Sequence, residues 1–270
     1  MELLNYTLTG DRHKPIMLFL HGFMGSGADF DAVVSRLSAD FCCLTVDLPG
    51  HGKTKVKPEL DYQMPAVAKA VVELLRQLNI SQCFLLGYSM GGRLALYLTV
   101  YFPQLFIKVI LESASPGLKT QVERDERLKQ DAKLIDRLLR VEFSVFLEQW
   151  YQNPLFSSFR QHPNYHQAIA QRIHNNPHEL AKSLQYMGLG VQPSLWDNLT
   201  TVQVPVLLIV GEYDTKFKEI NHDLADLLPQ AQLQLVKNSG HNVHFERSSQ
   251  FARIIQDFCG KTSKKHRHNQ

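Results

Sequence analysis

Short apolar segments recur along this chain and alternate with segments of helical periodicity. Five of them are rich in Val, Ile and Leu without polar alternation, which is typical of strands buried on both faces; they are residues 16–22, 42–48, 83–89, 107–113 and 204–212. A further predicted strand, LQLVK, follows at 233–237. Strands of this type require helices on both sides of their sheet, since neither face tolerates water.

The segments between the strands supply those helices. Their apolar residues recur at i, i+3, i+4 and i+7, which places them on one stripe of a helix; the stripes are Phe30, Val33, Val34 and Leu37, then Val67, Ala70, Val71, Leu74, Leu75 and Leu78, and finally Phe251, Ile254, Ile255 and Phe258. Alternation of strand and helix at this spacing predicts an α/β fold with a mostly parallel central sheet flanked by helices.

One long region interrupts this alternation. From about Gly117 to Trp196 the chain has no strand-like segment, is rich in charged helix formers, and is divided by Asn-Pro and His-Pro turns. We therefore expect a core domain of residues 1–116 and 197–260, with residues 117–196 inserted as a helical cap. Ligands of open α/β sheets bind at the carboxyl ends of the strands, so a cap leaving from that edge would cover the site.

Composition limits the partners. The formal net charge of the 270 residues is only +3, and the last ten residues carry four Lys or Arg and no acid. We expect residues 261–270 to form a disordered basic tail, with no nucleic-acid partner and no membrane partner. No apolar stretch is long enough to span a bilayer, and the first residues lack a signal-peptide pattern. A monomer or weak homo-oligomer acting on a small molecule is expected.

The four cysteines indicate the compartment. Cys42 and Cys43 are neighbours in a predicted strand, so their side chains point to opposite faces. Buried thiols in a reducing environment fit this arrangement better than a disulfide framework. The sequence therefore predicts a cytoplasmic protein. No pair of cysteines has zinc-finger spacing, and no spacing in the chain suggests a metal or an organic cofactor.

A serine between glycines is the clearest chemical motif. Residues 87–91, GYSMG, match the nucleophile-elbow pattern and lie between a predicted strand and a predicted helix, as that pattern requires. The turn is so sharp that the positions two before and two after the serine must be very small. Ser89 would then project above the sheet, and the amide of Met90 would point into the site from the start of the helix.

A serine hydroxyl needs a neighbouring base to take its proton. In an elbow fold the acid and the histidine follow the serine in that order, and Asp214 and His241 both come directly after predicted strands. Other residues compete for these roles; they are Glu212 and Asp223 for the acid, and His222 and His244 for the base. Asp214 could instead cap the following helix, and His241 could be an ordinary loop histidine.

The glycine-rich segment at residues 21–25, HGFMG, follows the first buried strand. Its glycines allow a backbone amide, expected to be that of Phe23, to point at developing negative charge beside the amide of Met90. Two such donors would form an oxyanion hole, and one donor typically lowers a barrier by a few kcal/mol. His21 is expected to be structural.

Several arginines favour an anionic ligand. Arg93 lies one turn after Ser89 on the same helix face, where it would border the site or form a salt bridge below it. The predicted cap adds three more, Arg124, Arg127 and Arg172. Guanidinium groups bind carboxylates with two parallel hydrogen bonds, so a group of them above a serine suits a substrate with several carboxylates.

The motifs together resemble the α/β-hydrolase superfamily over the whole chain except the tail. Within it the chain resembles the 2-succinyl-6-hydroxy-2,4-cyclohexadiene-1-carboxylate (SHCHC) synthase family between about residues 21 and 246. The segments that carry this resemblance are HGFMGS, VDLPGHG, GYSMGGRLAL, ESASPGL with ERDER, EQWYQNPLF, LGVQPSLW, GEYDTKF and GHNVHFE.

The resemblance implies specific residues and a reaction. It implies a triad of Ser89, Asp214 and His241, oxyanion amides at Phe23 and Met90, and a pocket lined by Tyr88, Arg93, Arg127, Trp150 and Arg172, with Arg124 as a less certain neighbour. The implied reaction eliminates pyruvate from a tricarboxylate, 2-succinyl-5-enolpyruvyl-6-hydroxy-3-cyclohexene-1-carboxylate, in menaquinone or phylloquinone biosynthesis. The alternative is hydrolysis of an ester or a carbon–carbon bond through a covalent intermediate on Ser89.

Overall fold

The computed structural model describes residues 4–56 and 59–260, so the predicted basic tail lies outside the described residues. A seven-stranded sheet forms its centre, in the order β1-β3-β2-β4-β5-β6-β7. The strands are β1 Tyr6–Thr9, β2 Ile16–Leu20, β3 Cys42–Val46, β4 Cys83–Tyr88, β5 Phe106–Glu112, β6 Val206–Gly211 and β7 Ala231–Val236. Every neighbouring pair is parallel except β1 with β3. The predicted α/β fold with a mostly parallel sheet is confirmed.

Side chains along each strand alternate between the two faces of the sheet. In β2, Leu18 and Leu20 belong to one hydrophobic cluster, whereas Met17 and Phe19 belong to a second cluster on the other face. This period of two residues is why buried strands read as continuous apolar runs: both faces are covered.

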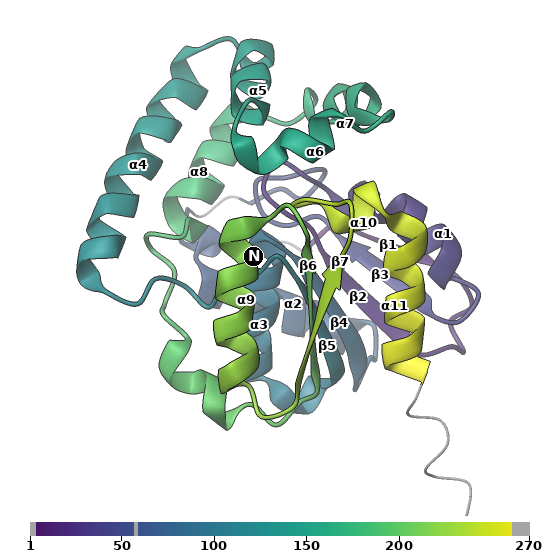
Figure 1. The fold of residues 1–270 in the computed structure, drawn as a ribbon. Helices are drawn as coiled ribbons and strands as arrows, with labels where there is room; N and C mark the ends of the chain where they lie inside the picture. The colour runs from purple at the N-terminus through teal and green to yellow at the C-terminus, as the bar shows by residue number, and fades with distance from the viewer. Residues whose placement is uncertain (1–3, 57–58, 261–270) are drawn as a thin grey trace, which may run out of the picture.

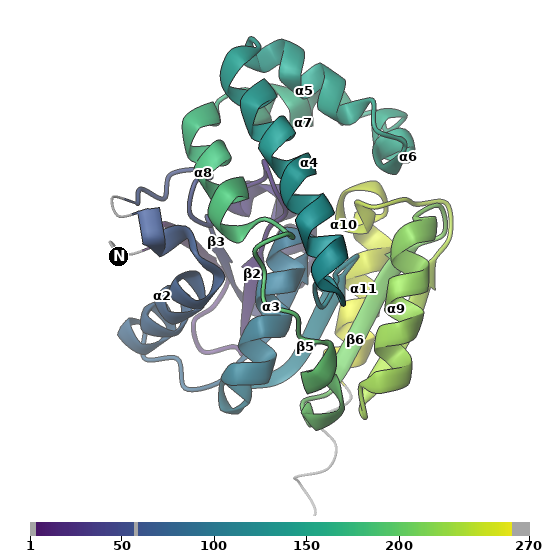
Figure 2. The same ribbon diagram turned by 90° about the vertical axis from the view of Figure 1, so that its left-hand side faces the viewer.

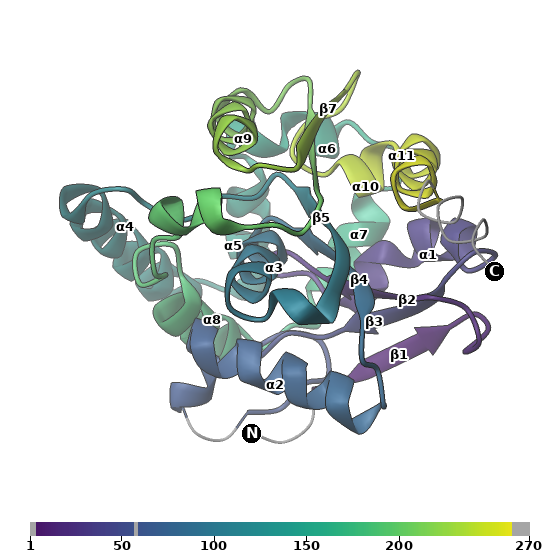
Figure 3. The ribbon, with the colours of Figure 1, turned by 90° about the horizontal axis from the view of Figure 1, so that it is seen from below.

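The helices cover these faces in two layers, as Figure 3 shows from below. Helices α1 (Asp31–Leu37) and α11 (Ser248–Gly260) lie on one side, and α2 (Met64–Gln77), α3 (Met90–Tyr101) and α9 (Thr215–Leu227) lie on the other. The apolar stripes read from the sequence face the sheet: Val33 and Ile255 join one cluster, and Val67 and Leu74 join the other.

Five helices are inserted between β5 and β6. They are α4 Gln121–Arg140, α5 Phe143–Tyr151, α6 Ser157–Arg160, α7 Tyr165–Arg172 and α8 Pro177–Met187, called the inserted helices below. They lie together above one edge of the sheet (Figures 1 and 2). A third hydrophobic cluster holds them together, with Phe146, Tyr151 and Phe159 among its buried residues. Thr120 and Glu123 form a capping box at the start of α4, and the side chain of Asn176 caps α8.

Strand β1 is one element that the sequence did not predict. Its residues YTLT alternate between half-buried and exposed, and it pairs only at the sheet edge, antiparallel to β3. A four-residue edge strand with polar alternation lacks the apolar signal of the central strands. Over the described residues, none of the helices combines the length and apolar character that crossing a bilayer requires.

Candidate active site

The turn between β4 and α3 holds Ser89 in a strained conformation. Its φ of 50° and ψ of −107° lie outside the regions that L-residues favour. The flanking glycines show why the turn needs them: a Cβ on Gly87 would lie 2.4 Å from the carbonyl oxygen of Gly91, and one on Gly91 would lie 2.1 Å from that of Leu20. The tight packing forces the serine side chain out of the turn and toward the cavity above the sheet.

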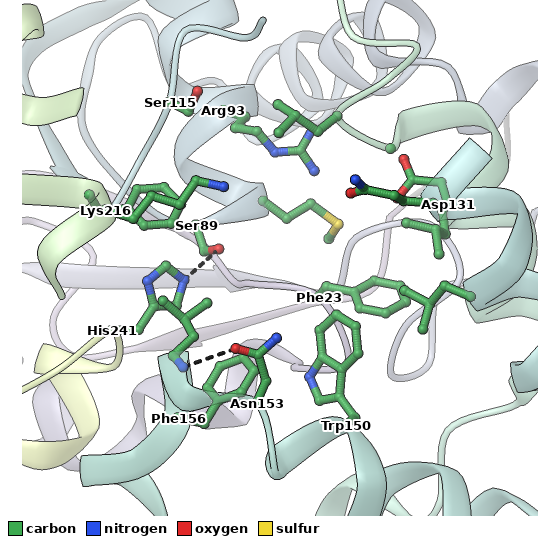
Figure 4. Close-up of a pocket in the computed structure, with 18 of the residues that line it drawn as sticks. Phe23, Ser89, Arg93, Ser115, Asp131, Trp150, Asn153, Phe156, Lys216 and His241 are labelled. Carbon is green, nitrogen blue, oxygen red and sulfur yellow. Dashed lines mark hydrogen bonds between the residues drawn. The ribbon is translucent and has the colours of Figure 1, made fainter. Parts of the chain in front are cut away.

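Ser89, His241 and Asp214 form a continuous hydrogen-bonded chain. His241 Nε2 lies 3.0 Å from Ser89 Oγ, and His241 Nδ1 lies 2.7 Å from Asp214 Oδ2 (Figure 4 shows the first of these). His241 and Asp214 are 3% and 2% exposed, so water competes little for these bonds. The hydroxyl of Ser113 donates a further bond of 3.1 Å to Asp214 Oδ2. Asp214 can therefore orient the imidazole while Nε2 accepts the serine proton.

Asp214 also satisfies the competing interpretation as a helix cap. It is the N-cap of α9, and its Oδ1 accepts a bond of 3.4 Å from the amide of Phe217. One carboxylate oxygen thus serves the helix and the other serves His241. The cap fixes the carboxylate that orients the imidazole, so the two interpretations describe one residue.

The competing acid and base candidates lie elsewhere. His244 Nδ1 is 2.8 Å from Glu112 Oε2 in a buried pair of its own. His222 is exposed on α9. Asp223 forms an ion pair with a surface lysine, and Glu212 accepts a bond from a backbone amide in the loop after β7. None of these four side chains bonds to Ser89 in the described structure.

His21 fixes the segment after β2 through two hydrogen bonds. Its Nε2 accepts a bond of 2.9 Å from the amide of Leu48, so the proton resides on Nδ1, which donates to the carbonyl of Gly22 at 2.8 Å. Burial lowers the pKa of His21, which keeps the ring neutral. A turn closed by the bond from Gly25 N to Gly22 O follows. His21 therefore has the structural role expected of it, and it fixes the turn that carries Phe23.

A cavity of about 800 Å³ lies between the carboxyl ends of the parallel strands and the inserted helices. Nine of the expected residues line it, and Figure 4 shows several of them; they are Phe23, Tyr88, Ser89, Met90, Arg93, Trp150, Arg172, Asp214 and His241. Arg127 lines it as well, whereas Arg124 is not among its lining residues within the described chain. The structure thus separates the two arginines of ERDER.

The cavity is strongly cationic. Six basic side chains line it, against two carboxylates; the basic residues are Arg93, Arg127, Lys133, Arg137, Arg172 and Lys216, and the acids are Asp131 and Asp214. Of the six cations, Arg127 pairs with Asp131 (Nε–Oδ1 2.7 Å) and Arg172 with Asp29 (Nη2–Oδ2 3.0 Å), so most of the positive charge lacks a carboxylate partner in the described chain. A cavity of this kind favours polyanionic small molecules.

Arg93 contributes a cation without a carboxylate partner. Its Nη1 donates to Gln192 Oε1 at 2.7 Å and to the carbonyl of Met187 at 3.1 Å. Burial and the neighbouring Arg127 lower the pKa of Arg93 to about 10. The alternative of a salt bridge below the site is not found within the described residues. Figure 4 shows the guanidinium facing the cavity.

Arg172 is bound more tightly. The side chain is 6% exposed, and its Nη2 lies 3.0 Å from Asp29 Oδ2. The guanidinium also lies over the rings of Tyr151 and Phe159, at 5.6 and 5.3 Å from their centroids. Burial alone would lower the pKa of Arg172, but Asp29 and the phenol of Tyr151 raise it above its usual value. Arg172 joins α7 to the segment after β2.

Aromatic side chains complete the wall. Trp150 lies edge-on to Phe23 at 5.7 Å and stacks on Phe146 at 6.3 Å, so it serves both the pocket and the hydrophobic cluster of the inserted helices. Tyr88 donates a bond of 2.7 Å to Asn242 Oδ1, and its ring packs against His241 at 5.4 Å. Tyr88 therefore packs against the imidazole of His241 and also lines the cavity.

Sequence reasoning missed several lining residues. On α4 they follow a helical stripe that starts at Arg127 and continues through Gln130, Asp131, Leu134 and Arg137. This spacing of three and four residues was readable once one member was assigned to the pocket. Lys216 had no comparable signal, because it lies in the first turn of α9, where a lysine reads as an ordinary surface residue.

No group of three or more His, Cys, Asp or Glu side chains within residues 4–56 and 59–260 is arranged to hold a metal ion. What the arrangement offers is a serine with an adjacent histidine, the lining residues Phe23 and Met90, and cations around them. It can accept a proton or attack a carbonyl, and it can bind anions.

Comparisons with known proteins agree with this geometry. The family described as alpha/beta hydrolase fold matches residues 15–248. The chain is 36% identical over 252 residues to a Bacillus subtilis protein provisionally named SHCHC synthase, with 92% of each covered. It is 32% identical over 271 residues to the SHCHC synthase of Photorhabdus laumondii, covering 100% of this chain and 94% of that one. The structure of MenH from S. aureus matches with a TM-score of 0.91 and 31% identity, covering 97% and 99% of the two chains.

Proposed function

We propose a lyase function for this protein, which belongs to the SHCHC synthase family within the α/β-hydrolase fold. The reaction eliminates pyruvate from 2-succinyl-5-enolpyruvyl-6-hydroxy-3-cyclohexene-1-carboxylate and leaves the conjugated cyclohexadiene, a step of menaquinone or phylloquinone biosynthesis. The observation that carries the proposal is a Ser–His–Asp chain at the floor of a cavity lined by six basic side chains. A neutral ester would give those cations no partner.

In this proposal Ser89 is the base. His241 takes the hydroxyl proton, and the Oγ activated in this way removes a proton from a ring carbon. The electron pair of that C–H bond forms a new ring double bond, the existing ring double bond shifts one position toward the enolpyruvyl group, and the C–O bond to that group breaks. The departing enolate takes up the proton held by His241 and becomes pyruvate. The amides of Phe23 and Met90 stabilise the negative charge that develops as the proton leaves. No acyl-enzyme forms.

The three carboxylates of the substrate account for the cations. Arg93 is proposed as a main contact, because it faces the cavity without a carboxylate partner. Arg127 and Arg172 would contribute less to substrate binding, since Asp131 and Asp29 already pair with them. Tyr88 and Trp150 would pack on the ring of the substrate. Arg124 is kept as an outer neighbour only.

We also propose a division of labour between two parts of the chain. Residues 1–116 and 197–260 would carry the triad and the oxyanion amides, and residues 117–196 would act as a cap that excludes water from the carbanion-like transition state. Cys42, Cys43 and Cys83 are buried free thiols, which supports a cytoplasmic, reducing location.

The decisive experiment mixes the purified protein with the enolpyruvyl substrate and follows pyruvate release together with diene absorbance. Both signals should rise in step. Ser89→Ala should lower kcat by about 10²–10⁴-fold, the range expected for loss of a general base. Ser35→Ala, an exposed serine on α1, should leave it unchanged.

Mass spectrometry separates the lyase from its rival. The same Ser89–His241–Asp214 chain would serve a hydrolase that forms a covalent intermediate. An acyl group trapped on Ser89 during normal turnover, without diene formation, would replace the lyase proposal by the hydrolase.

A further inference from the structure

A buried carboxylate holds the backbone on both sides of His241. Glu246, in the short helix α10 (Val243–Glu246), is 8% exposed. Its Oε2 accepts a bond of 2.9 Å from the amide of Gly240, and its Oε1 accepts one of 3.4 Å from the amide of Asn242. These are the residues directly before and after the imidazole. Residues 237–242 belong to no helix or strand, so no regular element fixes His241.

The same carboxylate reaches the inserted helices. Ser158 Oγ, in α6, and Glu246 Oε1 lie 2.2 and 3.6 Å from the position that a Cβ on Gly240 would occupy, and the hydroxyl favours the charged form of the carboxylate by lowering its pKa. Gly240 leaves the room for this contact, because a Cβ there would lie 2.2 Å from Ser158 Oγ. The ring of Phe245 packs edge-on against Phe159 of α6 at 4.9 Å. The segment that bears His241 is therefore packed against one of the inserted helices.

Keeping this carboxylate buried is costly in itself. Burial raises the pKa of Glu246, while the bonds from Gly240, Ser158 and Asn242 oppose that rise. An apolar side chain would fill the same space without this desolvation penalty. The three donors converge on the one group that can accept from all of them.

We propose that Glu246 is a positioning residue that aligns His241 with Ser89 and ties this alignment to the position of α6 through Ser158. The inference rests on the proposed triad and deepens it. A displacement of about 1 Å in a reacting group can cost roughly 100-fold in rate, so two amide bonds that bracket the histidine are enough to matter. Glu246 acts through His241 and needs no contact with substrate.

The test replaces one carboxylate oxygen of Glu246 by an amide nitrogen, which cannot accept a hydrogen bond. In Glu246→Gln the side-chain amide can accept from one of the two backbone amides, while its NH₂ group faces the other donor. We expect kcat to fall by about 10–100-fold with KM changed by less than about twofold. Ser158→Ala removes only the link to α6 and should lower kcat by about threefold. Glu212→Gln is the matched control, since Glu212 accepts a 2.9 Å bond from Asn238 in the same loop; it should leave kcat unchanged.

A second measurement does not depend on the substrate. Diisopropyl fluorophosphate reacts when Ser89 Oγ forms a bond to phosphorus, fluoride leaves, and His241 takes the hydroxyl proton, so its rate reports the alignment of the pair directly. This rate should fall in parallel with kcat in Glu246→Gln and Ser158→Ala. If the wild-type protein releases no pyruvate, the proposed reaction fails, but the rates of Ser89 phosphorylation by this reagent still decide the role of Glu246.

An unchanged rate of phosphorylation by the reagent and an unchanged kcat in folded Glu246→Gln would overturn the inference. So would a loss that follows the fraction of folded protein alone, measured by circular dichroism at the assay temperature. If Glu246→Gln does not fold, Ser158→Ala decides: a rate of phosphorylation by the reagent equal to that of the wild type refutes the coupling to α6, and a reduced rate supports it.

Discussion

Arg93 and Arg172 line the same cavity but have opposite surroundings. Arg93, on α3 beside the serine, bonds to an amide oxygen and a carbonyl and has no carboxylate partner in the described chain. Arg172, on α7 among the inserted helices, is paired with Asp29 at 3.0 Å and stacked on two aromatic rings. Correspondingly, the pKa of Arg93 is lowered to about 10, while that of Arg172 is raised.

The difference separates a binding cation from an anchoring one. A charge without a counter-ion in a confined site gains most from an arriving carboxylate, and the folded protein bears the desolvation cost until then. A charge already neutralised by Asp29 gains less from substrate and contributes more to holding α7 against the segment after β2. The site thus uses one residue type for two tasks, and substitutions should separate them.

The largest expected effect comes from removing the counter-ion of the anchoring arginine. Asp29→Asn leaves a buried guanidinium unpaired, which should lower the free energy of unfolding by about 3–5 kcal/mol. Chemical denaturation measures it. Asp31→Asn is the control: burial and Asp29 raise the pKa of that carboxyl, so neutralising it should cost nothing. Equal stability of Asp29→Asn and Asp31→Asn would show that Arg172 needs no anchor.

A second experiment compares the two arginines directly. Arg93→Met should lower kcat/KM roughly 10–150-fold, because a charge-assisted contact to substrate is lost. This fold-change corresponds to about 1.5–3 kcal/mol of activation free energy. It should not lower the thermal midpoint, since the buried charge it removes had no counter-ion. Arg172→Met should lower both quantities, and adding Asp29→Asn should restore part of the stability.

Arg124→Met is the control for these variants and should leave kcat/KM within about twofold of the wild type. A thermal midpoint that falls as far in Arg93→Met as in Arg172→Met would erase the distinction between the two sites.

The smallest effect is a pH dependence of anion binding to which Arg93 contributes a component of its own. Below pH 10 the Arg93 guanidinium is charged in the folded protein, so carboxylate binding does not depend on its titration. Above pH 10 the folded protein loses this proton while the unfolded chain, with the usual value of 12.5, keeps it. The Kd of a stable tricarboxylate should therefore rise up to about tenfold per pH unit. Titration calorimetry checks this, and Arg93→Met should lack that component.

Much of the fold could be predicted from the sequence, because apolar runs and helical stripes are local patterns. Unbroken apolar runs such as residues 204–212 predicted β6, and the stripe at Phe251, Ile255 and Phe258 predicted α11. Strand β1 was missed because its four residues pair at an edge with one face in solvent. Helix α6 was missed because four residues are too few to show a period.

The candidate site divides in the same way. The elbow at residues 87–91 was readable because glycines on both sides of Ser89 are a local requirement of the backbone. The arginines were readable as a group, but their partners were not: Arg172 meets Asp29 across 143 positions of sequence. Neither the separation of Arg127 from Arg124 nor the bracket around His241 follows from spacing.

The sequence by itself determined the alternation of strand and helix, the strained turn that projects Ser89, and a short set of possible acids and bases. Only the tertiary structure decided that Asp214 and His241 meet that serine while His244 turns to Glu112. The physical reason is that periodicity and turn chemistry act over a few neighbouring residues. Charge pairing and hydrogen bonding depend on distances that exist only after the chain has brought remote segments together.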